Sequence, residues 1–149
     1  MNELSMNPAF HAYVAASLAL MLNVLFLWVY SGVVRSRTKT VVNAEDSKVA
    51  KGAGLVDADP PEVARVLRAH RNAVDNILPF LVSGLLFVIV GGGVKAALVI
   101  FPAFVVFRVL HSYAYLQAKQ PFRTLAFVAG LVTTLVLMGW VGVLVARMA

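Results

Sequence analysis

Four polar side chains recur at helical spacing in the stretch RAHRNAVD at residues 68–75. They are Arg68, Arg71, Asn72 and Asp75, at positions i, i+3, i+4 and i+7. This spacing places them on one face of a helix. Guanidinium groups bind carboxylates in a bidentate fork, and a carboxylate can bind an ammonium group. The face predicts either a site for a zwitterionic ligand with excess carboxylate, or a structural network with an Arg71–Asp75 bridge.

A second polar group follows in the stretch RVLHSYAY at residues 108–115. It contains Arg108, His111 and Tyr115 at i, i+3 and i+7, followed by Arg123 and Thr124 at the start of the next predicted helix. Ionised side chains inside a bilayer are costly, so they usually face a partner, a cavity or a ligand. We expect both groups to lie at one bilayer depth, although Arg108 could also pair with Asp75 for structure alone.

Cysteine is absent from the chain. This absence excludes disulfides, thiolate-bound metals and a cysteine nucleophile, so any sulfur chemistry must use the thiol of a ligand. His70 has no second histidine or carboxylate around it at metal-binding spacing. The sequence therefore predicts no metal site.

Composition indicates a membrane protein of one domain, residues 1–149. The chain is 60% hydrophobic and only 13% charged, whereas a soluble domain is about 45–50% apolar and about 25% charged. The formal net charge of +6 could suggest nucleic acid. Cytosolic loops of membrane proteins are also rich in Lys and Arg, and this interpretation is the stronger one. We therefore predict no nucleic-acid partner.

Four runs are long enough to cross a bilayer, which takes roughly 20 mostly apolar residues. We predict an all-α integral membrane fold, a bundle of four transmembrane helices at residues 8–35, 61–91, 95–118 and 121–147. Residues 36–60 form the one long polar loop, in which a short helical turn can fit. Residues 1–8 lack the basic segment of a signal peptide, so the first helix is predicted to be retained.

The distribution of cations predicts the orientation. More Lys and Arg residues lie in or next to the long loop than at the opposite end of the helices, which has Lys95 and Arg147. Lys119 and Arg123 lie on the same side of the membrane as the loop. The positive-inside rule then places the long loop in the cytosol and both termini on the other side. Most cations of this loop are interpreted as contacts of lipid headgroups, with Arg35 as the exception because it adjoins the first span.

The sequence resembles the MAPEG family, the membrane-associated proteins of eicosanoid and glutathione metabolism. RAHRNAVDNILPF at residues 68–80 is similar to the helix-two signature of that family. RVLHSYAYL at residues 108–116 and PFRT at residues 121–124 are similar to the signature of its microsomal prostaglandin E synthase and microsomal glutathione transferase branch. The NAED loop at residues 43–46 is similar too. The resemblance covers nearly the whole chain.

The resemblance implies a homotrimer that binds glutathione between neighbouring subunits, toward the cytosol. The residues implied to hold glutathione are Arg35, Arg71, Asn72, Asp75, His111, Tyr115 and Arg123. Arg68 and Arg108 match family arginines near the same site. Arg123 and Thr124 match positions that stabilise the thiolate and carry chemistry, and Asp46 matches a loop aspartate regarded as a catalytic partner.

The sequence also departs from the family pattern. Asp75 stands where Glu is usual, which shortens the reach to an amine. Thr124 stands where the prostaglandin synthase has Ser, and Phe127 stands where Tyr is common. Ala73 replaces an acidic residue. The changes at Thr124 and Phe127 bear on prostaglandin chemistry more than on glutathione binding.

The predicted function is a glutathione-dependent transferase that acts on lipophilic electrophiles from the membrane. One alternative is a glutathione-dependent isomerase or peroxidase of lipid peroxides. Another is a non-catalytic lipid-binding membrane protein or a small transporter, although the inverted repeats typical of transporters are not evident. The predicted location is a bacterial inner membrane, or the endoplasmic reticulum in a eukaryote.

Overall fold

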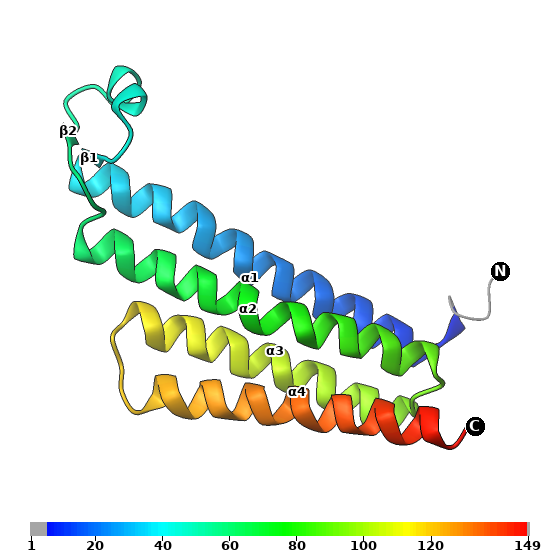
Figure 1. Ribbon diagram of the computed structural model, residues 1–149. Coiled ribbons are helices and arrows are strands. Elements are labelled where there is room, and N and C mark those ends of the chain that lie inside the picture. The colour runs from blue at the N-terminus through cyan, green and yellow to red at the C-terminus, as the bar shows by residue number, and fades with distance from the viewer. Residues whose placement is uncertain (1–5, 149) are drawn as a thin grey trace.

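The computed structural model describes residues 6–148 and contains four long helices. These are α1 (Pro8–Thr38), α2 (Pro61–Ile89), α3 (Val94–Leu116) and α4 (Phe122–Ala146). All four are long and apolar enough to cross a membrane. The start of α1 and the end of α4 lie at one end of the bundle, and the long loop lies at the other (Figure 1). The predicted four-helix membrane fold is confirmed, with helix ends within three residues of the expected ones.

Local chemistry fixes several helix ends. Asn7 caps α1 through its side chain, which accepts a hydrogen bond of 2.9 Å from the backbone nitrogen of Ala9. Pro61 opens α2 at a position where a missing N–H costs nothing. Past the end of α2, Gly91 adopts φ 77°, which favours glycine. A Cβ on Gly92 would overlap the ring of Phe87, so the turn between α2 and α3 needs glycine there as well.

Helices α2 and α3 lie between α1 and α4. Helix α1 packs on α2 and α3, α4 packs on the same two helices, and α1 and α4 do not touch. Buried phenylalanines join α2 to α3: the rings of Phe80 and Phe104 stack with centroids 3.6 Å apart, and Phe101 packs edge-on against Phe80. Such pairs contribute about 0.5–1.5 kcal/mol beyond their buried area.

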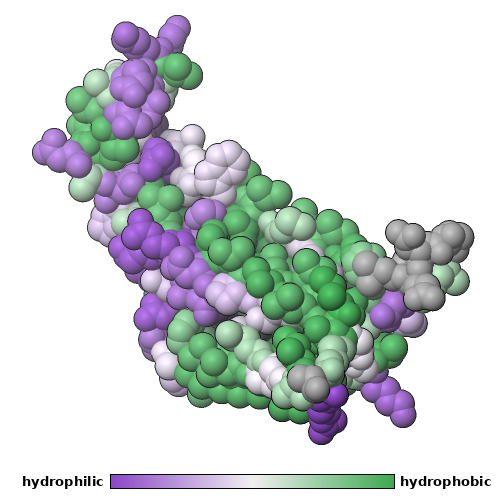
Figure 2. Space-filling view, turned by 45° about the vertical axis from the view of Figure 1, so that its right-hand side comes forward, coloured by the Kyte–Doolittle hydropathy of each residue, from purple (hydrophilic) through white to green (hydrophobic). Residues whose placement is uncertain are grey.

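Most of the apolar side chains of α1 and α4 lie outside this core and are exposed. Only 17% of the most apolar window of α1, and the same share of α4, is buried. Figure 2 shows hydrophobic surface over the helices and hydrophilic surface gathered at the loop end. That distribution suits a molecule surrounded by lipid or by other copies of itself.

The long loop is more ordered than the sequence predicts. The expected helical turn is a 3-10 helix, η2 (Ala44–Lys48). Around it, β1 (Thr40–Val41) pairs in parallel with β2 (Gly54–Leu55), a short pairing within the predicted loop. Strands of two residues have no alternating pattern, so the sequence could not reveal them. An ion pair of 2.7 Å between Arg35 and Asp59 ties the end of the loop to α1. Residues 1–5 of the predicted N-terminal segment lie outside the described residues.

Candidate functional site

A guanidinium group lies inside the bundle, near the loop end. Arg108 on α3 is 0% exposed. Its Nη2 donates hydrogen bonds to the side-chain oxygen of Asn72 at 2.8 Å and to the backbone oxygen of the same residue at 3.3 Å. The same nitrogen lies 3.4 Å from Nδ1 of His111. Arginine has no acceptor, so this last contact requires Nδ1 to carry no proton.

The charge of Arg108 is not balanced within the described part of the protomer. Its Nε and Nη1 atoms are buried and have no hydrogen-bond partner. Asn72 is neutral, and the one ion pair among residues 6–148 joins Arg35 to Asp59. A buried charge is costly unless it is paired. On the side of α4, Gly130 leaves room next to this group, with Cδ and Nη1 of Arg108 at 3.5 and 3.9 Å from an added Cβ.

From Arg108 a series of contacts leads along α3 to α4. The rings of His111 and Tyr115 pack edge-on with centroids 5.6 Å apart. The guanidinium carbon of Arg123 then lies 4.6 Å from the centre of the Tyr115 ring, a cation–π contact. We call the series Asn72–Arg108–His111–Tyr115–Arg123 the polar chain. It joins three helices, and the ring of Phe127 lies 6.1 Å from that of His111.

At the end of the polar chain, Gln120 lies against both Arg123 and Thr124. With the amide oxygen of Gln120 toward the guanidinium, it accepts from Nη2 of Arg123 at 2.6 Å and from Nε at 3.2 Å. The amide nitrogen then donates to Oγ1 of Thr124 at 3.0 Å. We adopt this orientation because the opposite one faces the amide nitrogen toward the guanidinium donors. Gln120 is not among the residues predicted from the sequence, although Arg123 and Thr124 follow it at i+3 and i+4, a spacing that indicates contact on one helix face.

The remaining predicted residues of α2 point outward. Arg68, Arg71 and Asp75 are exposed on the helix that carries Asn72. The possible Arg71–Asp75 bridge does not form, and Arg108 bonds to Asn72 rather than to Asp75. The three exposed groups are therefore accessible to a ligand.

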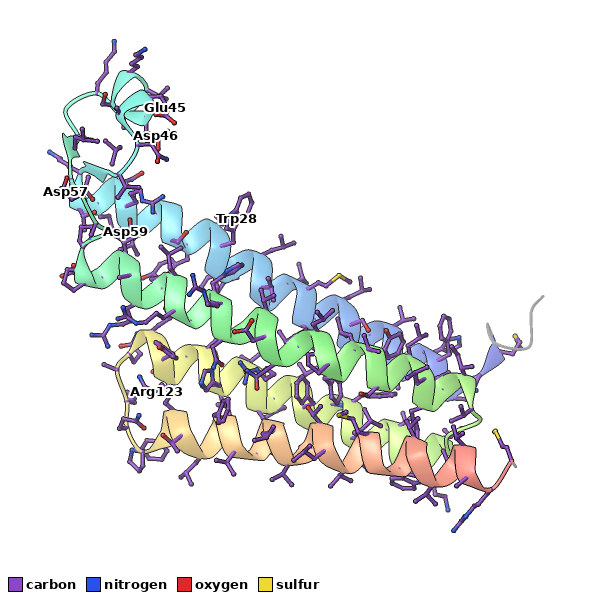
Figure 3. All side chains as sticks on the ribbon, in the orientation of Figure 1. Trp28, Glu45, Asp46, Asp57, Asp59 and Arg123 are labelled. Atoms are coloured by element: carbon purple, nitrogen blue, oxygen red, sulfur yellow. The ribbon has the colours of Figure 1, made fainter. Side chains whose placement is uncertain are left out.

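Arg35 and Asp46 lie apart from this cluster. Both line a hollow of about 660 Å³ between the end of α1 and the long loop, together with Lys39 and Lys51. Figure 3 shows Asp46 on the loop beyond α1, on the other side of the bundle end from Arg123 at the start of α4. Because α2 and α3 separate α1 from α4, one protomer does not bring the two parts together.

Two other features lie elsewhere. A groove of about 940 Å³ between α1, α2 and α3 contains none of the predicted site residues. We place the candidate site on the polar chain instead, since the unpaired buried charge needs a ligand or a partner and an apolar groove alone does not. Among residues 6–148, no group of three His, Asp or Glu side chains could hold a metal ion.

The sequence is similar to that of a known protein family and of several known proteins. The model of the MAPEG family matches residues 13–143. Prostaglandin E synthase of Homo sapiens is 34% identical over 122 residues, which cover 81% of this chain and 80% of that protein. Microsomal glutathione S-transferase 1 of Sus scrofa is 34% identical over 139 residues, with 91% of this chain and 90% of that protein covered. The chain is therefore a multi-pass membrane protein that belongs to the MAPEG family.

Proposed function

We propose that this protein is a glutathione transferase that joins the glutathione thiol to lipophilic electrophiles at the membrane. The observation that carries the proposal is the buried, unpaired guanidinium of Arg108 at the head of a polar chain that ends at Arg123. The names of the relatives, a glutathione S-transferase among them, support the same chemistry.

Glutathione fits the charges that the site leaves open. It carries more carboxylates than ammonium groups, together with one thiol. Arg68 and Arg71 are exposed and can bind carboxylates, and the uncompensated charge of Arg108 behind Asn72 adds to the attraction for an anion. Asp75, exposed on the same helix, can take the ammonium group. Its shorter side chain requires the amine to approach α2 more closely than a Glu would.

Arg123 carries the chemical step in this proposal. A free thiol has a pKa of about 8.5, which neighbouring cations lower. Arg123 stabilises the thiolate, Thr124 donates a hydrogen bond to it, and the thiol proton leaves to solvent. The sulfur then forms a bond to the electrophilic carbon, and the leaving group departs with the electrons of the broken bond. Tyr115 and Gln120 hold the guanidinium from two sides, so the site acts by positioning and charge stabilisation.

A homotrimer would complete the site. Arg35 and Asp46 lie on the α1 side of the protomer, apart from Arg123. A neighbouring copy could present these residues to the exposed side chains of α2 and to Arg123, which a single protomer cannot do. The exposed apolar surfaces of α1 and α4 are available for such contacts. We further propose that the long loop faces the cytosol, in a bacterial inner membrane or in the endoplasmic reticulum.

Turnover of chlorodinitrobenzene with glutathione by the purified protein tests the proposal. We expect Arg123→Gln to lower turnover by about 100-fold, the cost of removing one preorganised donor. The thiolate absorbance that glutathione develops on binding should fall in parallel. Arg147→Gln, at the opposite end of α4, is the matched control and should keep full activity. Equal turnover by the Arg123 variant and the wild type would remove Arg123 from the mechanism.

A second candidate is isomerase or peroxidase chemistry on lipid peroxides, favoured by the likeness to a prostaglandin E synthase. Product analysis separates the two, because a transferase product retains glutathione and an isomerisation returns it. Against this candidate, the ring near His111 is Phe127, which lacks a phenol. Calorimetry with glutathione separates both enzymes from a non-catalytic lipid-binding protein, which need not bind it.

A further inference from the structure

The groove of about 940 Å³ lies on the side of α3 that faces away from the polar chain. Its walls are side chains of α1 and α3, among them Leu22, Phe26 and Val109. Leu22 is 67% exposed and Phe26 is 54% exposed, so the groove is open along its length. In a membrane protein, such an open apolar wall faces acyl chains rather than water.

Charged side chains gather at one end of this groove only. Arg37, Arg65 and Glu62 line its mouth at the loop end. The one ion pair among the described residues lies elsewhere, between Arg35 and Asp59. The three mouth residues therefore have no salt-bridge partner within 4.0 Å. Two guanidinium groups against one carboxylate leave an excess positive charge where the apolar wall meets water.

The groove is long enough to hold a lipid of one membrane leaflet. Its lining on α1 runs from Ala19 to Thr38, which is about 28 Å along a helix at 1.5 Å per residue. One leaflet contributes about half of a hydrocarbon core that is roughly 30 Å thick. At an inner position Asn23 donates a hydrogen bond of 3.1 Å to Oγ of Ser112, so these polar atoms satisfy each other and require no ligand.

We propose that the groove binds an anionic phospholipid of the leaflet on the loop side, with one acyl chain along α1 and α3 and the phosphate between Arg37 and Arg65. The apolar wall fits the chain, and the unpaired guanidinium groups fit the phosphate. Glu62 lowers the excess charge at the mouth, which favours a singly charged headgroup over a more highly charged one.

This lipid is not a substrate of the proposed transferase. Val109 and Ser112 line the groove, whereas Arg108 and His111, one residue before each of them, face the interior toward α2 and α4. One residue turns the helix by about 100°, so the body of α3 separates the groove from the polar chain. The lipid would stabilise the packing of α1 on α3 without contacting the reacting thiol.

Native mass spectrometry of the purified full-length protein tests the proposal, from micelles that contain either dioleoyl phosphatidylglycerol or dioleoyl phosphatidylcholine. We expect retention of phosphatidylglycerol over phosphatidylcholine, and a loss of roughly tenfold in the double variant Arg37→Gln, Arg65→Gln. The double variant Arg37→Lys, Arg65→Lys keeps the charges and should keep most of the binding. Arg147→Gln, which removes a positive charge at the opposite end of the bundle, is the control and should change nothing.

A second pair of variants tests the acyl chain. Ala19→Trp fills the inner groove and should reduce lipid retention, whereas Val99→Trp, at an exposed position on α3 outside the groove, should not. Equal retention of the two lipids, or no effect of the Gln double variant, would overturn the proposal. So would a change of oligomeric mass in Ala19→Trp with unchanged lipid retention, because a second copy would then be the occupant. Glutathione binding should be normal in every variant, which keeps this test separate from the transferase activity.

Discussion

Near the loop end, two faces of α3 each present three side chains at i, i+3 and i+7, but the two faces have different surroundings. Arg108, His111 and Tyr115 face α2 and α4. The set one residue further along, Val109, Ser112 and Leu116, lines the groove beside α1. The first face is buried and holds an unpaired charge, whereas the second lines the groove of about 940 Å³, which has charge only at its mouth. We place the polar ligand at the first face because a buried charge without a partner is costly, whereas an apolar hollow needs no polar ligand.

Among the changes considered, Arg108→Met should have the largest effect on glutathione binding. We expect glutathione to bind tens of times more weakly, because the site loses a buried positive charge whose attraction for an anion is about 2 kcal/mol. Stability should stay unchanged or rise, since an apolar side chain of similar volume replaces an unpaired buried charge. Calorimetry with glutathione and thermal unfolding followed by circular dichroism measure the two effects. Normal affinity together with lower stability would make Arg108 a structural residue and break the comparison.

Asn72→Leu should act on stability in the opposite direction. The change removes the acceptor of the 2.8 Å bond and leaves Nη2 of Arg108 with poorer partners. A buried donor without its partner costs about 1–3 kcal/mol. The double variant Arg108→Met, Asn72→Leu should recover most of that loss, since neither polar group then remains. Additive effects in this cycle would mean that the two side chains do not depend on each other.

Gln120→Leu should reduce turnover by a smaller factor, about three- to tenfold. Arg123 would lose the amide oxygen at 2.6 Å but would keep the face of Tyr115. Because the guanidinium is less well positioned, we expect a lower kcat with a nearly unchanged KM. Steady-state kinetics at saturating glutathione measure this split. A change confined to KM would assign Gln120 to substrate binding instead.

Ser112→Ala should have the smallest effect. It tests whether a change on the groove face of α3 affects the face that holds Arg108. It removes the bond to Asn23 on the groove face, one residue away from His111. We expect unfolding to become easier by about 1 kcal/mol and turnover to stay at the wild-type value. A clear loss of turnover would show that the two faces of α3 are coupled.

The membrane fold could be predicted from the sequence, and so could the helix faces that carry the candidate site. Uncharged runs of bilayer length need no partner to become helices, so the four spans could be predicted from residues close in sequence. The same local periodicity placed Arg108, His111 and Tyr115 on one helix face. It could not identify the acceptor of Arg108, since Asn72 and Asp75 stand on the same stripe of α2 and only the rotation of α2 against α3 selects between them.

Tertiary structure decided the rest. It set Gly130 beside Arg108 and brought Arg123 onto the ring of Tyr115. It left Asp46 on the other side of the bundle end from Arg123, in a hollow that Arg35 also lines. Helix formation depends on hydrogen bonds four residues apart, which the sequence specifies directly. The meeting of side chains from different helices depends on how Phe80, Phe101 and Phe104 pack α2 against α3. That packing is a property of many distant residues together, so only the folded molecule shows it.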